Sequence, residues 1–184
     1  MKPILEIALI TGMRKGEILK MRWKDVDFRL GIIRITVENS KTKQERLIPI
    51  DSNLIAEFDS IEKKGEYVFM SDLTGDRKKR IEGAFKAACE EAGIQCGRKG
   101  GLTFHDLRHL AASRLVKMTD VVTAAKILGH SELKTTLRYV HPTEKDKRLA
   151  VEKASEFLFQ GRQKDVNGQK SAALEELEIR AQIN

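Results

Sequence analysis

Three clusters of arginine, histidine and tyrosine hold the side chains that could act on a phosphate group. The first cluster spans residues 11–17 (TGMRKGE). An arginine beside a glycine at a helix start can face an anion, because backbone N–H groups there also point outward. Glu17 follows Arg14 by three residues and could support its guanidinium group. The alternative is an exposed ion pair at i, i+3, which this cluster on its own favours.

The second cluster is HDLRH, residues 105–109. On a helix, His105 shares a face with Arg108 and with His109. The two histidines could bind a metal, as in the HExxH zinc proteases, but Asp106 is a poor substitute for the glutamate of that motif, which also needs a third ligand. Alternatively, Arg108 binds an oxyanion while His105 donates a hydrogen bond to it. An ordinary polar helix start remains the third interpretation.

The third cluster joins LGH, residues 128–130, to TTLRYVHP, residues 135–142. His130 follows a glycine that should end a helix, and Tyr139 comes nine residues later. A lone tyrosine is usually a packing residue. Close to two arginines and two histidines, however, a phenolate would be stabilised by the fixed positive charges.

The elements that must position these clusters form a mainly helical α+β fold with a small antiparallel sheet. The hydrophobic pattern predicts a β-hairpin from Ile32–Val37 and Leu47–Ile50, with a basic tip, and a third strand at Tyr67–Phe69. Residues 23–27 read as a loop. The expected helices are Pro3–Ile10 (buried nearly all round and ended by Gly12), Lys15–Arg22, Ser52–Lys64, Lys79–Ala92, Phe104–Val116 (capped by Thr103), Val121–Leu128 (ended by Gly129), Leu133–Tyr139 and Thr143–Phe159.

The composition indicates one globular domain that binds a polyanion. The chain has 34 basic and 27 acidic side chains, a net charge of +7, and 41% hydrophobic residues. Residues 1–50 carry 11 basic and 6 acidic side chains, net +5, and the last 23 residues are neutral, so the charge belongs to the folded body. No apolar run approaches the ~20 residues of a membrane-spanning helix, and the start lacks a signal peptide. Cys89 and Cys96 fit no zinc pattern.

Four stretches, in this order and spacing, resemble the catalytic domain of the tyrosine recombinases, the phage integrase family: TGMRKGEIL, SKTKQERLIPI, FHDLRH and LGHSELKTTLRY. The resemblance runs from about Pro3 to about Phe159. It implies a catalytic domain at residues 1–160 without the N-terminal DNA-binding arm of the family, as in a fragment or a truncated gene product. Residues 161–184 would form a linker and an exchange helix.

The resemblance also implies the roles of individual residues. The family's catalytic positions fall on Arg14, Lys41, His105, Arg108, His130 and Tyr139, and its supporting acidic position falls on Glu17. Tyr139 would be the nucleophile that forms a 3′-phosphotyrosyl bond, and Lys41 would protonate the leaving 5′-oxygen. Lys43 is the alternative to Lys41, because one sequence does not fix the hairpin register. His109 matches a common but non-catalytic position.

The implied partners are double-stranded DNA and further copies of the chain, in a homotetramer that exchanges C-terminal segments. No cofactor or metal is expected, since the sequence has neither a P-loop nor a carboxylate cluster for magnesium. A cytoplasmic protein is expected, acting at a bacterial nucleoid or encoded by a phage or mobile element, with no membrane contact. Three alternatives stay open: a catalytically inactive integrase-derived DNA-binding protein, a type IB topoisomerase and a zinc hydrolase.

Overall fold

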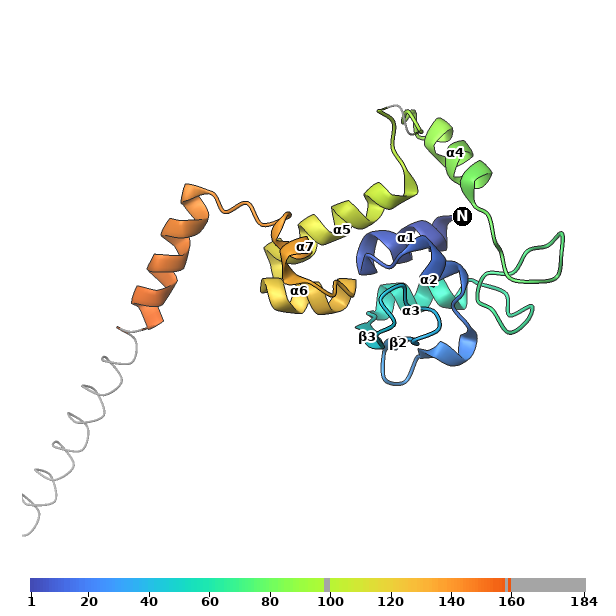
Figure 1. Cartoon of the computed structure of the whole chain (residues 1–184), viewed down its shortest axis with the longest axis horizontal. Coiled ribbons are helices and arrows are strands. Elements are labelled where there is room, and N and C mark those ends of the chain that lie inside the picture. The colour runs from blue at the N-terminus through green and yellow to red at the C-terminus, as the bar shows by residue number, and fades with distance from the viewer. Residues whose placement is uncertain (98–99, 158, 160–184) are drawn as a thin grey trace, which may run out of the picture. The chain divides into compact units, whose positions relative to one another are not determined.

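The computed structural model describes residues 1–97, 100–157 and 159 (Figure 1). The chain divides into two compact units, Met1–Val140 and His141–Asn184. Within the described residues, no helix is long and apolar enough to cross a membrane. The linker and helix expected within residues 161–184 lie outside the described part of the chain.

The first unit is mainly helical and contains one small sheet, which confirms the expected fold class. Its elements are α1 (Lys2–Thr11), α2 (Lys15–Leu19), the 3₁₀ helix η1 (Trp23–Asp25), β1 (Val26–Asp27), β2 (Ile32–Ile35), β3 (Arg46–Pro49), α3 (Ser52–Asp59), α4 (Glu82–Glu91), α5 (Phe104–Met118), α6 (Val121–Leu128) and α7 (Leu133–Leu137).

Helix α1 packs along α5 (Figure 1). Pro3 lies in its first turn, where a missing backbone N–H is tolerated, and Gly12 ends it with a left-handed φ of 64°. Ile4 and Ile7 are buried, but Ile10 is 48% exposed. The expectation that this helix is buried nearly all round was therefore wrong, because one side faces solvent.

The sheet has the strand order β1-β2-β3, and both pairs are antiparallel. The predicted hairpin is confirmed, with Ile33 opposite Ile48 and Ile32 opposite Pro49 on the edge strand. Because side chains alternate along a strand, Ile33 and Ile48 enter the core together. The hairpin thus carries its tip out of a firmly packed base.

The third strand is β1 and not the expected Tyr67–Phe69, which makes one isolated bridge, from Tyr67 to Arg22. The N–H of Val68 donates to Met21 O at 2.9 Å, so this segment holds residues 21–22 extended and α2 ends early, at Leu19. A similar backbone pairing makes α4 begin later in the chain than expected, at Glu82. Lys78 N–H donates to Phe69 O at 2.7 Å, which keeps the expected helix start extended.

Helix α5 begins where its capping signal predicts but runs to Met118, past the expected Val116, and α6 matches its expected range. The Asp106 carboxylate accepts from both the N–H and the hydroxyl of Thr103, each at 2.7 Å, and starts α5. The Asp120 carboxylate accepts from two N–H groups at the start of α6. Gly129 ends α6 with φ 66°. α7 is shorter than expected, and Tyr139 lies in the turn after it.

In the second unit, residues 144–157 are helical, as expected. Thr143 and Asp146 form a reciprocal capping pair at its start, because each accepts from the other's backbone N–H, at 2.7 and 3.2 Å. Leu149, Val151 and Phe157 are exposed on this helix.

Candidate active site

Glu17 is a buried carboxylate that holds Arg14. Arg14 is the N-cap residue of α2. Its backbone N–H donates to Glu17 Oε2 at 2.9 Å and its Nη1 donates to Oε1 at 3.1 Å. The Glu17 side chain is only 2% exposed, so the alternative of a solvated surface pair was wrong. Glu17 supports Arg14, as the sequence suggested.

Arg46 is the second partner of Glu17, and sequence reasoning missed it. From the start of β3, its Nη1 and Nη2 donate to the two carboxylate oxygens at 3.2 and 2.7 Å. Burial acts to raise the pKa of Glu17, but the hydrogen bond and charge of Arg46, together with Arg14, hold that pKa below its usual value. One feature of the sequence could have identified Arg46. Side chains alternate along a strand, so Arg46 lies on the same face of β3 as the buried Ile48.

Arg108 lies inside the first unit rather than on its surface. This α5 residue is 4% exposed, and its Nη1 and Nη2 donate to Gly12 O at 2.5 Å and Leu128 O at 2.7 Å. Burial, followed by the nearby charge of Arg14, lowers the pKa of Arg108 to about 10. The side chain therefore stays cationic at neutral pH and is held at both ends of its guanidinium group.

The C-terminal end of α6 brings the three arginines together. Three successive carbonyl groups there each accept from one arginine. Ile127 O accepts from Arg46 Nε at 3.1 Å, and Leu128 O accepts from Arg108 Nη2 at 2.7 Å. Gly129 O accepts from Arg14 Nη2 at 3.3 Å. Carbonyls at a helix C-terminus lack helical partners and carry partial negative charge. The resulting cluster has three guanidinium groups and one carboxylate, a net charge of +2, which suits an anion.

Gly129 is required at the point where Arg46 approaches. A Cβ atom there would lie 2.6 Å from Arg46 Nη1, and its φ of +66° disfavours other residues. The turn carries His130, whose Nδ1 lies 2.8 Å from the buried hydroxyl of Thr136. Burial and then the charge of Arg108 lower the pKa of His130 to about 4. His130 is therefore a neutral imidazole at pH 7.

Tyr139 meets α5 through His109. Its hydroxyl lies 2.5 Å from His109 Nδ1, and the ring centroids are 5.7 Å apart. The rings of His105 and His109 contact edge to face at 4.6 Å, as expected for neighbours on one helix face. Burial, followed by the charges of His109 and Arg108, lowers the pKa of His105. Among the described residues, no three His, Cys, Asp or Glu side chains form a group that could hold a metal.

Lys41 and Lys43 lie at the exposed hairpin tip. In the described part of the chain, neither makes a hydrogen bond or an ion pair with the other candidate residues. A hollow of about 390 Å³ runs from Thr42 and Arg46 on the hairpin to Gly129 and His130. The structure thus brings together Arg14, Glu17, His105, Arg108, His130 and Tyr139, and leaves both lysines outside these contacts, on the exposed hairpin tip.

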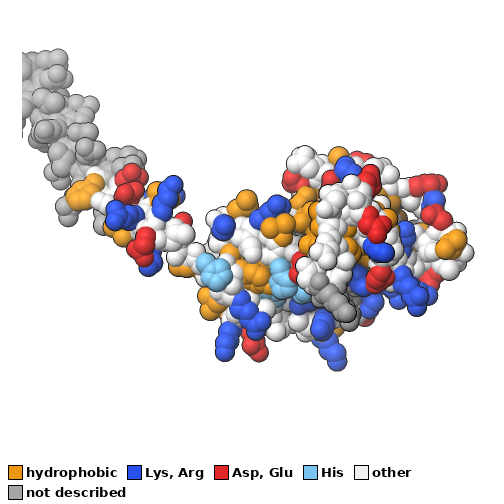
Figure 2. All heavy atoms as spheres, turned by 90° about the horizontal axis from the view of Figure 1, so that it is seen from above, with side chains coloured by type: hydrophobic (Ala, Val, Ile, Leu, Met, Phe, Trp, Pro, Cys, Tyr) orange, Lys and Arg blue, Asp and Glu red, His pale blue; other side chains and the backbone are white. Residues whose placement is uncertain are grey.

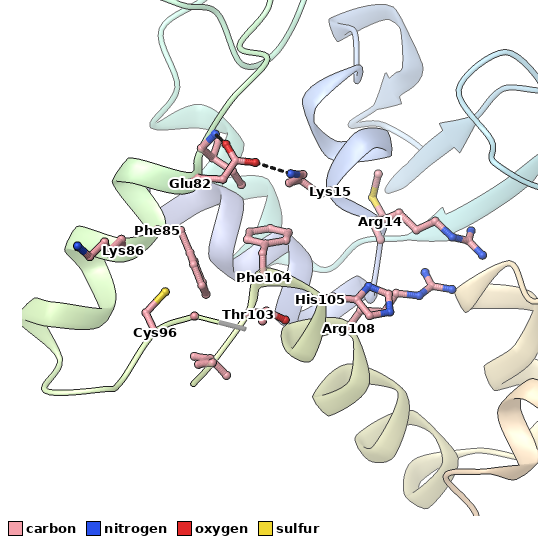
Figure 3. A pocket seen from close by; sticks show the side chains of 14 residues that line it. Arg14, Lys15, Glu82, Phe85, Lys86, Cys96, Thr103, Phe104, His105 and Arg108 are labelled. Carbon is pink, nitrogen blue, oxygen red and sulfur yellow. Dashed lines mark hydrogen bonds and ion pairs between the residues drawn. The ribbon is translucent and has the colours of Figure 1, made fainter. Parts of the chain in front are cut away.

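A second hollow opens beside the arginines. Arg14, His105 and Arg108 lie together at one end of a pocket of about 560 Å³, and the rings of Phe85 and Phe104 line its middle (Figure 3). Histidine side chains are visible on the surface of the molecule, and lysine and arginine side chains project near them (Figure 2). The charged lining of this pocket is mainly basic, with Arg14, Lys15, Lys86 and Arg108 against Glu82, which suits an anionic ligand.

Comparison with known proteins decides the family. Residues 1–146 match the model of the phage integrase family. The chain belongs to this family. It is 28% identical over 146 residues to tyrosine recombinase XerC of Xanthomonas axonopodis pv. citri, covering 76% of this chain and 46% of that protein.

Two solved structures share its fold. The catalytic domain of bacteriophage HP1 integrase is 31% identical with a TM-score of 0.61, covering 82% of this chain and 79% of that one. The Tn1549 transposon integrase in complex with transposon right end DNA has a TM-score of 0.69 at 22% identity, covering 83% and 58%. This integrase-family chain spans about half the length of the curated relatives it matches.

Proposed function

We propose that this chain is the catalytic part of a site-specific DNA recombinase that cuts and rejoins DNA through Tyr139. The observation that carries the proposal is the cluster of three arginines at the end of α6, beside His130 and with Tyr139 on the same unit. Its relatives are named as recombinases and integrases, and one structural neighbour was solved with DNA, which supports a DNA substrate.

Cleavage would proceed by attack of Tyr139 Oη on a DNA phosphorus atom. The new O–P bond replaces the bond to the 5′-oxygen, and the products are a 3′-phosphotyrosyl link and a 5′-hydroxyl. Arg14 and Arg108 would neutralise the charge that develops on the non-bridging oxygens. Because these guanidinium groups are already fixed to carbonyls and to Glu17, little reorganisation is needed as the charge grows.

Protonation of the leaving 5′-oxygen falls to Lys41, or to Lys43, at the hairpin tip. Both side chains are exposed, so the tip must fold toward the phosphate when DNA binds. His130 is neutral and would donate a hydrogen bond to a phosphate oxygen rather than add another charge. The phosphotyrosyl bond keeps the bond energy for rejoining, so neither a nucleotide nor a metal is called for.

Residues 1–160 would be the catalytic domain, and the segment from His141 onward would contact other protomers. The helix at residues 144–157 exposes Leu149, Val151 and Phe157, apolar side chains that a second protomer could cover. This supports a homotetramer on DNA with exchange of C-terminal segments. Because bacterial and phage DNA is found in the cytoplasm, a DNA substrate would also favour a cytoplasmic location.

A covalent-trapping assay tests the proposal. The chain is mixed with nicked duplexes of varied sequence, so that the cleaved strand diffuses away, and adducts that resist SDS are collected. We expect adducts with the wild type and none with Tyr139→Phe, which loses only the hydroxyl and should bind DNA equally well. Adducts from Tyr139→Phe would exclude Tyr139 as the nucleophile. If the wild type gives none, even when fused behind an N-terminal DNA-binding arm, the chain binds DNA without cutting it.

A further inference from the structure

We propose that His109 is a catalytic residue: the base that takes the proton from Tyr139 as it attacks, and returns it on rejoining. This inference rests on the proposed strand-transfer function and assigns a role that the family resemblance did not give to His109. It starts from one contact, in which His109 Nδ1 lies 2.5 Å from the Tyr139 hydroxyl. In the described part of the chain, this is the one side chain that is hydrogen-bonded to the reacting oxygen.

The contact joins two elements that are fixed independently. His109 lies on α5, which is capped at Thr103 and packed along α1. Tyr139 lies in the turn after α7, where its N–H donates to Thr136 O at 3.0 Å. Thr136 is fully buried. A chance surface contact would need no such anchoring on both sides, whereas a catalytic pair needs both groups held in place.

The proton transfer balances within these two side chains. Neutral His109, with its proton on Nε2, accepts the hydroxyl proton of Tyr139 on Nδ1 while the Oη–P bond forms. His109 is then an imidazolium ion. During rejoining, the 5′-hydroxyl attacks phosphorus and gives its proton to the lysine that had protonated it, Lys41 or Lys43, while the P–Oη bond breaks and the imidazolium returns its own proton to the phenolate oxygen. One histidine thus serves as base in one direction and as acid in the other.

The surrounding charges favour proton transfer from Tyr139 to His109. Asp106, one turn before His109 on α5, is ionised, since its hydrogen bonds with Thr103 lower its pKa, and it can stabilise an imidazolium ion. His105 contacts His109 edge to face, and burial lowers the pKa of His105, so that it adds no positive charge at neutral pH. Arg14 and Arg108 are the nearby cations, and a bound phosphate would offset them.

The alternative is that the Tyr139–His109 contact holds the nucleophile at rest and must break before DNA is cut. The two possibilities predict opposite results. If His109 is the base, His109→Phe slows the formation of covalent adducts by about 10²- to 10⁴-fold, while DNA binding is unchanged. If the contact is a lock, His109→Phe cuts DNA as fast as the wild type or faster, and the proposal fails.

Two DNA substrates distinguish whether His109 acts as the base for Tyr139 or as the acid for the leaving 5′-oxygen. In a duplex with sulfur in place of the bridging 5′-oxygen, the leaving group departs without protonation. We expect Lys41→Ala to regain cleavage on this duplex and His109→Phe to remain as slow as on the oxygen duplex. Equal recovery of both variants would place His109 on the leaving group and overturn the proposal.

Two further variants separate proton transfer from positioning. His109→Asn keeps a side chain that can hydrogen-bond Tyr139 but cannot take its proton, so it should stay slow, and full activity would leave only a positioning role. His109→Ala should be partly restored by added imidazole, which a purely structural residue would not show. Leu110→Phe, an exposed neighbour on α5, is the matched control and should cut like the wild type. The wild type must first be shown to form adducts that Tyr139→Phe does not form. Failure at that step would contradict the proposed function, whereas failure of the His109 variants to slow cleavage would contradict only the role of His109.

Discussion

At the scale of single residues, Glu17 is the carboxylate on which the arginine cluster depends. The nearly inaccessible Glu17 side chain accepts from Arg14 and Arg46. Within the described residues, it is the one acidic group that is hydrogen-bonded to the three arginines. A buried carboxylate left unpaired would be strongly unfavourable. Arg14 and Arg46 therefore hold Glu17 ionised as much as Glu17 holds them, and the remaining positive charge is left for a phosphate.

Arg108→Ala should impair cleavage more than binding. Removal of a fixed donor to the developing charge typically lowers a rate by about 10²- to 10³-fold, whereas one lost phosphate contact weakens ground-state binding much less. Single-turnover trapping and equilibrium DNA binding measure the two effects separately. Because Arg108 also satisfies two buried carbonyls, Arg108→Lys serves as a second variant that retains a cation. Equal losses in rate and binding would make Arg108 a phosphate-positioning contact.

His130 should make the fold less stable in mild acid. Its pKa is about 4 in the folded chain and about 6.5 when exposed, so between these pH values the unfolded chain binds a proton that the folded chain does not. The free energy of unfolding should therefore fall as pH drops from 6.5 toward 4. Urea titrations should show a shallower fall for His130→Asn, with the rest of the slope due partly to His105. Identical slopes would contradict the assigned cause.

At the scale of elements, the end of α6 connects parts of the chain that are otherwise separate. It receives Arg14 from α2, Arg46 from β3 and Arg108 from α5. The hairpin is therefore attached to α6 through Arg46, which also lines the hollow that reaches His130. Displacement of any one of these elements would alter the spacing of the charges.

Arg46→Ala should destabilise the protein far more than Arg34→Ala. Arg46 is 8% exposed and bidentate to Glu17, and loss of one partner from a buried pair costs about 3 kcal/mol or more. Arg34, on the adjacent strand β2, is exposed, and such substitutions usually change stability by less than about 0.5 kcal/mol. Urea denaturation compares the two variants directly. Similar midpoints would show that the Glu17–Arg46 pair adds little.

The elements that sequence reasoning placed well have local causes. Asp120 and Gly129 delimit α6, and Thr103 starts α5, through contacts within four residues. The misplaced elements depend on distant partners, as where Tyr67 pairs with Arg22 and takes the place of a helical turn.

The contacts of the candidate site also divide into local ones, which the sequence could predict, and distant ones, which it could not. Arg14 and Glu17 are three residues apart, and their pairing follows from the capping geometry at the start of α2. Arg46 reaches Glu17 across 29 positions, and His109 reaches Tyr139 across 30. Residue spacing predicts neither contact, since each forms only when separate elements of the chain pack together.

At the scale of the whole molecule, the positive charge is spread over the folded body and should govern affinity for DNA. Each phosphate that a lysine or arginine neutralises releases bound counterions, so the logarithm of the association constant falls linearly with the logarithm of salt concentration. We expect at least a tenfold loss of affinity between about 50 and 200 mM salt. Fluorescence anisotropy with a labelled duplex measures this, and an affinity independent of salt would argue against phosphate contacts as the main source of binding.

The long reach of the arginine contacts has a consequence during protein synthesis. The carbonyl partner of Arg14 is made 115 residues after it, and the carbonyl partner of Arg108, at Gly12, lies 96 residues before it. Tyr139 follows all of them. A nascent chain that ends before Gly129 lacks both the assembled arginine cluster and Tyr139, and one that ends between Gly129 and Tyr139 still lacks Tyr139. Under the proposed function, this order of residues would keep the chain unable to cut DNA until Tyr139 has been made.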